Sequence, residues 1–391
     1  MKTHWRLPRG VDEILPPAAW QLELLRRKVL DLFVSWGFEY VEPPVIEYLE
    51  SLLVGSGEDL DLQTLKVVDQ ASGKQLGVRA DMTSQAVRID AHSRATDEVQ
   101  RLCYAGPVVF ANPQLAMASR VPFKAGAEIF GAPDIAADAE IVSLMLQTIE
   151  SANIEEPVLL LGHMGIYRGL VDALLQDGVL DPVAERDLFD SVQRKSQSDI
   201  TALLAPSALT DMLIALPTLM GGANALDAAH TTLAAAPEAV LHALAQLQTL
   251  VETVAQQSRG TVRVDVSELS GYGYHNGPVF AVYHPQHGQA LAQGGRYDGI
   301  GAVFGRSRPA TGFDVNLKAL LGSVEGADII FAPYAQGQAS ISLAHAIAEL
   351  RARGERVQCA LSAAERPPGG CRRIMTLTND EWRVQPTDAD Q

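Results

Sequence analysis

Apolar side chains recur every three or four residues in several segments, a spacing that places them on one side of an α-helix. Residues 18–36 show this pattern clearly, with Leu25, Val29 and Phe33 on one stripe and Gly37 following as a helix terminator. Further helices are predicted at residues 84–95, 135–149, 240–254 and 339–353.

Short apolar runs between turn-forming residues predict β-strands. Residues 38–41 form such a run, and Pro43-Pro44 after it indicate an edge strand, because proline cannot donate to a central ladder. Residues 65–78 are typical of a hairpin that turns at Ser72-Gly73. Further strands are predicted at residues 102–110, 123–130, 158–161, 262–266, 279–283, 290–293, 328–333 and 356–361. Strands mixed with long amphipathic helices indicate an α+β or mixed α/β fold.

Changes in composition divide the chain into parts. Residues 167–257 are rich in Ala and Leu and poor in β-branched runs, which predicts a helical insertion between strands of one core. We expect that core to span residues 1–324. Residues 325–391 are expected to form a small, truncated α/β unit of one strand–helix–strand, with a loose tail from Glu365.

The 391 residues are 47% apolar and 20% charged, as expected of a globular chain with two or three domains. The net charge of −16 disfavours nucleic acid as a partner, because an acidic chain repels phosphate backbones. No apolar run approaches the ~18 residues that span a bilayer. Residues 1–17 also lack the apolar core of a secretory signal, so a cytoplasmic protein with no membrane partner is expected.

The cysteines and histidines give no metal-binding pattern. Cys103, Cys359 and Cys371 lie far apart, which indicates neither a disulfide framework nor a zinc site. His275 has no second histidine at ligand spacing. We therefore expect no metal and no cofactor.

Four segments gather glycine, polar and aromatic residues within apolar surroundings: residues 79–85, 124–131, 270–277 and 294–299. Each segment also has an ordinary structural interpretation. The first is a helix start capped by Asp81 or Thr83, and the second is an edge strand with its charges in water. The third is a hairpin turn at Asn276-Gly277, and the fourth is a simple turn at Gly294-Gly295.

Together with shorter matches, these segments resemble histidyl-tRNA synthetase, a class II aminoacyl-tRNA synthetase. The resemblance is carried, in order, by residues 79–85, 106–107, 126–131, 138–140, 274–277, 294–298 and 309–320. It implies an α+β fold with an antiparallel sheet flanked by helices. It also implies a homodimer formed through the first class II motif, which here is the helix and strand that end at Pro43-Pro44.

The resemblance implies a histidine pocket. Asp81 and Thr83 match residues that bind the α-ammonium group, and Glu128 and Tyr274 match residues that bind the imidazole edges. Lys124 replaces a glutamine; either it supplies a cation for the ligand carboxylate or it is a surface lysine in an abandoned pocket. The full predicted pocket is Asp81, Thr83, Lys124, Glu128, Tyr272, Tyr274, His275, Arg296 and Tyr297.

Three arginines that hold ATP in the synthetase are missing at the matching positions. Phe110, Ser270 and Ala319 stand in their places, and Lys318 is one position away from the last. Adenylation needs cations directed at the phosphates, and the loss of one such donor costs about 10²–10³ in rate. We therefore predict no catalytic residues.

A synthetase-like core without adenylation chemistry or a full anticodon-binding domain resembles the regulatory subunit of ATP phosphoribosyltransferase, the first enzyme of histidine biosynthesis. This resemblance implies a hetero-octamer with the short-form catalytic subunit, and histidine as the feedback effector. The alternative is an active histidyl-tRNA synthetase or another amino-acid-activating ligase with relocated cations. A third hypothesis is a histidine-binding sensor or scaffold with a different partner.

Overall fold

The computed structural model describes residues 6–53, 58–113, 118–271, 273–322 and 329–387. Contacts divide the chain into two compact units. The large unit extends to Leu321, and the small one holds the residues from Gly322 onward together with the short segment Leu15–Trp20. The core boundary expected at residue 324 lies outside the described residues.

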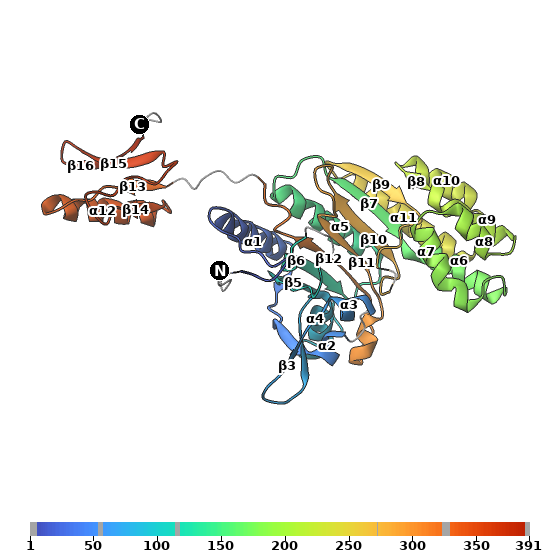
Figure 1. Cartoon of the computed structure of the whole chain (residues 1–391). Helices are drawn as coiled ribbons and strands as arrows, with labels where there is room; N and C mark the ends of the chain where they lie inside the picture. The colour runs from blue at the N-terminus through green and yellow to red at the C-terminus, as the bar shows by residue number, and fades with distance from the viewer. Residues whose placement is uncertain (1–5, 54–57, 114–117, 272, 323–328, 388–391) are drawn as a thin grey trace. The chain divides into compact units, whose positions relative to one another are not determined.

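A nine-stranded sheet forms the centre of the large unit, in the order β1-β5-β6-β12-β11-β10-β7-β9-β8 (Figure 1). The neighbours from β5 to β7 in this order are all antiparallel, whereas β1 pairs parallel with β5 and β9 parallel with β7. The strands are β1 Glu39–Tyr40, β5 Gln100–Pro107, β6 Phe123–Phe130, β7 Val158–His163, β8 Met220–Gly221, β9 Thr261–Asp265, β10 Pro278–Tyr283, β11 Ala292–Arg296 and β12 Ala310–Asn316. The expected antiparallel sheet and the edge position of β1 are confirmed.

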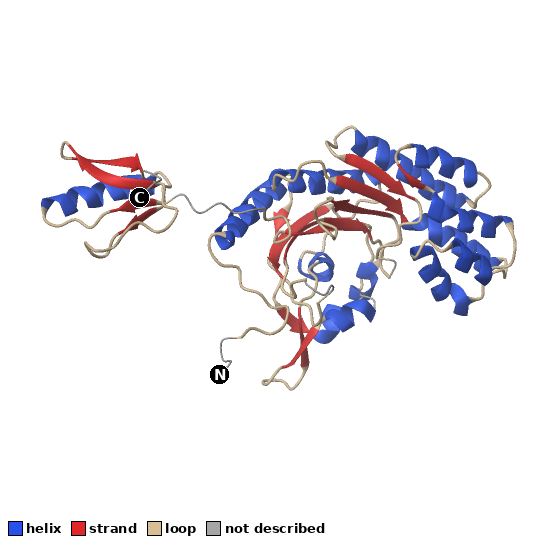
Figure 2. Cartoon of the chain, turned by 45° about the horizontal axis from the view of Figure 1, so that its top comes forward, coloured by secondary structure: helices blue, strands red, loops and turns tan. Residues whose placement is uncertain are grey.

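Long helices cover the outer face of this sheet. They are α1 Ala18–Ser35, α5 Ile135–Ser151, α6 Met164–Gln176 and α11 Glu238–Ala255, all close to their predicted bounds where one was given. Their apolar stripes share one core with the sheet; Val29 and Phe33 of α1, for example, are fully buried. Figure 2 shows the strands curving, with long helices along the outer side of the curve.

The inner face of the sheet carries a second, smaller core. The short helix α4 (Thr83–Arg88) packs there through Ala86 and Val87, against Tyr104 of β5 and Tyr297. A wider turn, Ile89–Ser93, continues α4, so the predicted helix at residues 84–95 is present in a less regular form. The tyrosine side chains thus lie on the face away from the long helices.

The expected helical insertion lies between β7 and β9. It contains α6, α11 and the helices α7 Glu185–Gln193, α8 Gln197–Leu203, α9 Ala208–Ala215 and α10 Asn224–Thr232. The helices begin at Met164, and β8 adds a short strand that the composition did not indicate. Lys195, between α7 and α8, is anchored to the sheet by an ion pair with Asp265 of β9 (2.7 Å).

A three-stranded sheet, in the order β2-β4-β3, follows β1. Its elements are β2 Ile46–Tyr48, α2 Leu49–Leu53, α3 Glu58–Gln63, β3 Leu65–Val68 and β4 Gln75–Val78. β3 and β4 form the predicted hairpin, in which Gly73 has the positive φ of 72° that a tight turn requires.

The small unit contains the predicted strand–helix–strand, formed by β13 Ile330–Ala332, α12 Gln338–Ala352 and β14 Val357–Cys359. The prediction of a loose tail is wrong. Strands β15 Arg373–Thr378 and β16 Glu381–Pro386 form a hairpin that extends the sheet. Asn379 and Asp380 turn it with positive φ angles of 53° and 63°, the pattern of a type I′ turn. Trp382 holds it to α12 by donating to Ser342 (3.1 Å).

Candidate functional site

The inner face of the nine-stranded sheet is hollowed by a cavity of about 910 Å³. Four neighbouring strands present one row of residues on its floor, namely Asp314, Gln293, Ala281 and Leu160. The start of α4, the loop before β10 and helix α7 of the insertion also line it. The cavity is therefore shared between the core and the insertion.

Strand β6 supplies two of the charged residues of the cavity. Because β6 lies between β5 and β12, its interpretation as an edge strand is wrong. Ala125 and Ala127 face the core under the long helices, whereas Lys124 and Glu128 line the cavity on the opposite face. The strand period of two therefore points the charged side chains away from the helical layer.

Glu128 is held at the bottom of the cavity by two tyrosines. The hydroxyl of Tyr104 donates to Oε1 at 2.8 Å, and that of Tyr297 donates to Oε2 at 2.5 Å. Thr83 adds a hydrogen bond to the Tyr104 hydroxyl at 3.2 Å. Burial raises the pKa of Glu128 to about 8, although both tyrosine hydrogen bonds lower it. This carboxyl group therefore changes its protonation state near pH 8 instead of near its ordinary value of 4.5.

A glycine makes room for this carboxyl group. Gly312 of β12 lies directly opposite Glu128 in the ladder. A Cβ atom at Gly312 would approach Oε2 of Glu128 to 1.5 Å. Every other residue type would therefore displace the carboxylate from the tyrosines.

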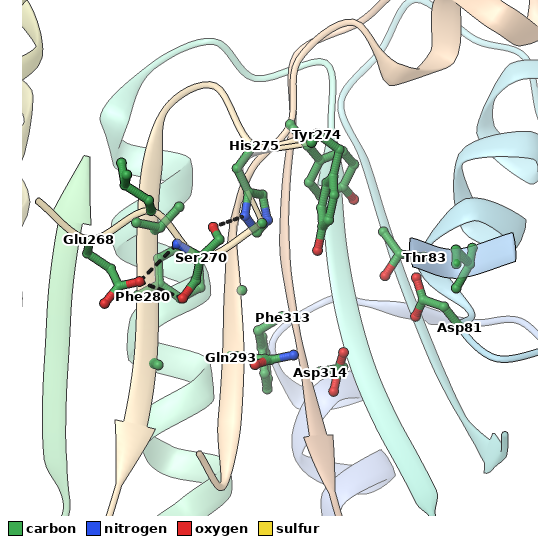
Figure 3. A pocket seen from close by; sticks show the side chains of 18 of the residues that line it. Asp81, Thr83, Glu268, Ser270, Tyr274, His275, Phe280, Gln293, Phe313 and Asp314 are labelled. Atoms are coloured by element: carbon green, nitrogen blue, oxygen red, sulfur yellow. Dashed lines mark hydrogen bonds between the residues drawn. The ribbon is translucent and has the colours of Figure 1, made fainter. Parts of the chain in front are cut away.

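Asp81 and Thr83 lie where α4 begins. Neither is the N-cap that the ordinary interpretation suggested, because the N-cap is Met82, whose side chain makes no capping hydrogen bond. One carboxylate oxygen of Asp81 accepts from the Met82 amide at 2.7 Å. Both side chains line the cavity and point toward the space that Tyr274 and Asp314 also face (Figure 3).

The loop before β10 brings His275 and Tyr274 into the wall. Nδ1 of His275 lies 3.1 Å from the Ser270 carbonyl, and burial lowers the histidine pKa to about 4, so the neutral ring donates this hydrogen bond. The Tyr274 ring packs on it with a centroid distance of 4.1 Å. Tyr272 lies outside the described residues.

The hairpin turn considered at Asn276-Gly277 is wrong, because β9, the strand before this loop, pairs with β7 and not with β10. Asn276 instead exchanges two hydrogen bonds with Asp298, at 2.9 and 3.0 Å. This pair fixes the loop against the segment that follows β11.

The side chains of Arg296 and Tyr297, which are adjacent in sequence, lie on opposite sides of the sheet. Tyr297 lines the cavity, but Arg296, which we predicted for the pocket, lies outside its lining. The Arg296 guanidinium donates to the buried carboxylate of Asp138 at 2.6 and 3.0 Å and pairs with Asp298 at 3.2 Å. Successive strand residues face opposite sides, so Arg296 ties the sheet to α5 instead.

The described lining of the cavity is rich in carboxylates. It contains six, from Asp81, Glu128, Glu185, Asp190, Glu268 and Asp314, but only two cations, from Lys124 and Arg186. The Lys124 ammonium forms an ion pair with Asp314 at 2.9 Å. A cavity of this charge favours a ligand with a cationic group and disfavours a triphosphate.

Two of the three positions that lack the expected arginines lie in the cavity wall. Phe110 and Ser270 line the cavity, whereas Ala319 packs against the core under the long helices. Lys318 is outside the described lining and pairs with Asp12 at 3.2 Å, so it does not replace the lost cations.

The sequence reasoning missed two residues of the site. Tyr104 binds Glu128, and Asp314 pairs with Lys124. Tyr104 lay in a predicted strand, and a hydroxyl group within an apolar run was the available signal. Asp314 is an acid between Phe313 and Val315, which is a signal for a buried pairing.

The described part of the chain offers neither a membrane-spanning helix nor a metal-binding cluster. Within the described residues, no helix is long and apolar enough to cross a membrane. Nor do those residues contain a group of three or more His, Cys, Asp or Glu side chains placed to hold a metal ion.

Comparisons with known proteins match both units. Residues 10–320 match the family model described as histidyl-tRNA synthetase. Residues 327–385 match the one described as ATP phosphoribosyltransferase subunit HisZ C-terminal domain. A histidyl-tRNA synthetase from Nostoc sp. PCC 7120 shares the fold, with a TM-score of 0.81 at 16% identity over 98% of this chain and 95% of that one.

Relatives with higher sequence identity are described as ATP phosphoribosyltransferase regulatory subunits. ATP phosphoribosyltransferase regulatory subunits of Ectopseudomonas mendocina and Chromohalobacter salexigens are 45% and 46% identical to this chain, each over 98% of both chains. A solved structure from Bacillus halodurans, titled as an ATP phosphoribosyltransferase regulatory subunit/histidyl-tRNA synthetase, has a TM-score of 0.80 at 26% identity. It covers 94% of this chain and 95% of that one.

Fold and family match together define a class II synthetase-like protein, whose described cavity lining is rich in carboxylates and poor in cations. The small unit, with its own family match, separates it from the synthetases themselves. The chain belongs to the family of ATP phosphoribosyltransferase regulatory subunits. Its role is accordingly regulatory and not catalytic, as the missing arginines predicted.

Proposed function

We propose that this chain binds L-histidine in the cavity and thereby controls a catalytic ATP phosphoribosyltransferase subunit with which it assembles in the cytoplasm. The observation that carries the proposal is Glu128, fixed between Tyr104 and Tyr297 at the bottom of an acid-rich cavity. A fixed carboxyl group suits an imidazole N–H, because it offers an oriented acceptor at a buried position.

The remaining groups of the ligand also find partners by charge. Asp81 supplies a carboxylate for the α-ammonium group, and Thr83 a hydroxyl beside it. Tyr274 packs near Tyr297, with ring centroids 6.3 Å apart, and its hydroxyl offers a partner for the second ring nitrogen. These contacts favour one arrangement of α4 and the loop before β10. Such a preference couples ligand binding to a partner with a free energy of about 1–3 kcal/mol.

The proposed assembly is a hetero-octamer of four regulatory and four catalytic subunits, built on regulatory dimers. The dimer contact proposed here is α1 with β1. β1 is an edge strand of the large sheet, and large apolar side chains near it are exposed, including Leu24, Val34, Tyr40 and Ile46. Exposed apolar groups gathered beside an open sheet edge are typical of a protein interface.

Titration calorimetry with L-histidine tests the pocket, using the purified chain alone and with the short-form catalytic subunit. We expect Glu128→Ala to weaken histidine binding at least tenfold, because it removes the oriented acceptor. The matched control is Glu355→Ala, a partly exposed glutamate of the small unit, paired with Arg373. Equal affinity in wild type and Glu128→Ala would exclude this pocket.

Two further measurements test the rest of the proposal. Co-purification with the short-form catalytic subunit is expected, and histidine should inhibit the assembled enzyme but not a complex that carries Glu128→Ala. Histidine-dependent exchange of pyrophosphate into ATP should be absent, because the cavity offers few cations to the phosphates. Exchange at an appreciable rate would support the synthetase alternative instead.

A further inference from the structure

Lys124 and Asp314 form an ion pair in the wall of the ligand cavity. They come from neighbouring strands: Lys124 lies opposite Asn316, and Asp314 lies opposite Gly126, so the two side chains meet diagonally across the ladder. The Lys124 Nζ to Asp314 Oδ2 distance is 2.9 Å. Both residues line the cavity, with side chains only 15% and 17% exposed.

A third charge completes the group. Burial lowers the pKa of Lys124, but the charges of Asp314 and Asp81 outweigh it and the pKa lies above its ordinary value. Burial raises the pKa of Asp314, and the Lys124 ammonium opposes that shift while the charge of Asp81 adds to it. Lys124 is thus a cation paired with Asp314, and Asp81, already assigned to the ligand ammonium, lines the same cavity.

We propose that this ion pair is the receptor for the α-amino-acid zwitterion, with Lys124 binding the ligand carboxylate and Asp314, together with Asp81, binding the ligand ammonium. The inference rests on the proposed function and adds a specificity-determining residue, Asp314, to that pocket. The ligand class is then the free α-amino acids, in which the ammonium and carboxylate groups are bonded to the same carbon atom.

The physical reason is that the two charges of the ligand are opposite in sign to those of the Lys124–Asp314 pair. An unpaired buried charge destabilises the folded state, so Lys124 and Asp314 keep each other ionised and hydrogen-bonded. A zwitterion carries the same two charges in the opposite order. When it docks beside the pair, each protein charge gains a partner of opposite sign, and the net charge of the site stays the same. A ligand that lacks one of the two charges leaves one protein group without its new partner.

The test is a titration of four ligands against four proteins by calorimetry. The ligands are L-histidine, L-histidinol, which lacks the carboxylate, imidazolepropionate, which lacks the ammonium, and imidazole. The proteins are wild type, Lys124→Gln, Asp314→Asn and the control Lys318→Gln, whose lysine pairs with Asp12 outside the described cavity lining. A charge-assisted hydrogen bond contributes enough for an effect of roughly 10- to 100-fold in affinity.

Each variant has a distinct expected pattern. Lys124→Gln should weaken histidine and imidazolepropionate by ~10- to 100-fold and change histidinol by less than ~3-fold. Asp314→Asn should weaken histidine and histidinol by a similar factor and spare imidazolepropionate. Lys318→Gln should bind all ligands as wild type does.

Loss of one partner leaves the other charge unpaired, so a single variant could fail to fold. The double variant Lys124→Gln/Asp314→Asn leaves no unpaired charge and keeps the side-chain volumes. It should fold and bind histidine at least ~10-fold more weakly than wild type does, with Asp81 as the remaining charged partner of the ligand ammonium.

Two outcomes distinguish a failure of the zwitterion receptor from a failure of the proposed function. The first outcome is that wild type binds histidine and Glu128→Ala weakens this binding, but the Lys124 and Asp314 variants change the affinity for all four ligands by the same factor. The proposed zwitterion receptor would then be refuted, whereas histidine binding in the cavity would still be supported. If wild type binds no histidine, or binds it as well with Glu128→Ala, the proposed function itself fails.

Discussion

The substitution Gly312→Ala is a strong test of the pocket geometry, because one methyl group meets the central carboxylate. The new Cβ would lie 1.5 Å from Oε2 and 2.4 Å from Cδ of Glu128, less than half of a van der Waals contact for the first. It would also lie 2.7 Å from the carbonyl oxygen of Ala127, which belongs to the neighbouring backbone. Glu128 must therefore leave its place.

Two contributions set the expected magnitude. Overpacking a tight interior costs about 1–3 kcal/mol. Glu128 also loses its hydrogen bonds from Tyr104 and Tyr297, now 2.8 and 2.5 Å long, at about 1 kcal/mol each. We expect the free energy of unfolding in urea to fall by about 3–5 kcal/mol, and histidine affinity to fall at least tenfold. Gly288→Ala is the matched control, because a Cβ there meets nothing within 4 Å. A Gly312→Ala protein with wild-type stability and histidine affinity would refute the placement of Glu128.

The remaining predictions concern charge and the small unit. Burial raises the pKa of Glu128 from 4.5 to about 8, so between these pH values the folded chain keeps a proton that the unfolded chain has released. The free energy of unfolding should therefore fall as the pH rises from 4.5 to 8. Urea melts across this range should show a flatter slope for Glu128→Gln than for wild type. Arg296→Met should cost about 3–5 kcal/mol, since it leaves the buried Asp138 carboxylate unpaired; an Arg296→Met/Asp138→Leu double variant that is no more stable would contradict this reason. Trp382→Phe removes the hydrogen bond to Ser342 and should cost about 1 kcal/mol, with faster amide exchange in β15 and β16; unchanged exchange would count against that contact.

Local patterns predicted most of the fold. The helices α1, α5 and α11 and the strand β6 lie within two residues of their predicted bounds, because each has a strong apolar period and a clear terminator. The tail was the main error. Its two strands are largely exposed, so their apolar signal is weak, and the Asn379-Asp380 turn lacks the glycine that usually marks such a hairpin.

The site was predicted less completely. The structure brings to one cavity seven of the residues that the sequence analysis predicted for the pocket, namely Asp81, Thr83, Lys124, Glu128, Tyr274, His275 and Tyr297. Arg296 was placed there wrongly because adjacency in sequence says nothing about which side of the sheet a side chain faces. The edge-strand interpretation of β6 failed for a related reason, since charged residues in a strand look the same whether they face water or an interior cavity.

The amino-acid sequence alone determined which elements form, which family the chain resembles and which phosphate-binding arginines it lacks, because these depend on residue identity and short-range spacing. Strand order and register decided the rest. They placed Gly312 opposite Glu128 and Asp314 diagonal to Lys124, although each pair is separated by more than 180 residues. Partners that distant are chosen by the closure of the whole sheet, whose free energy no local pattern contains.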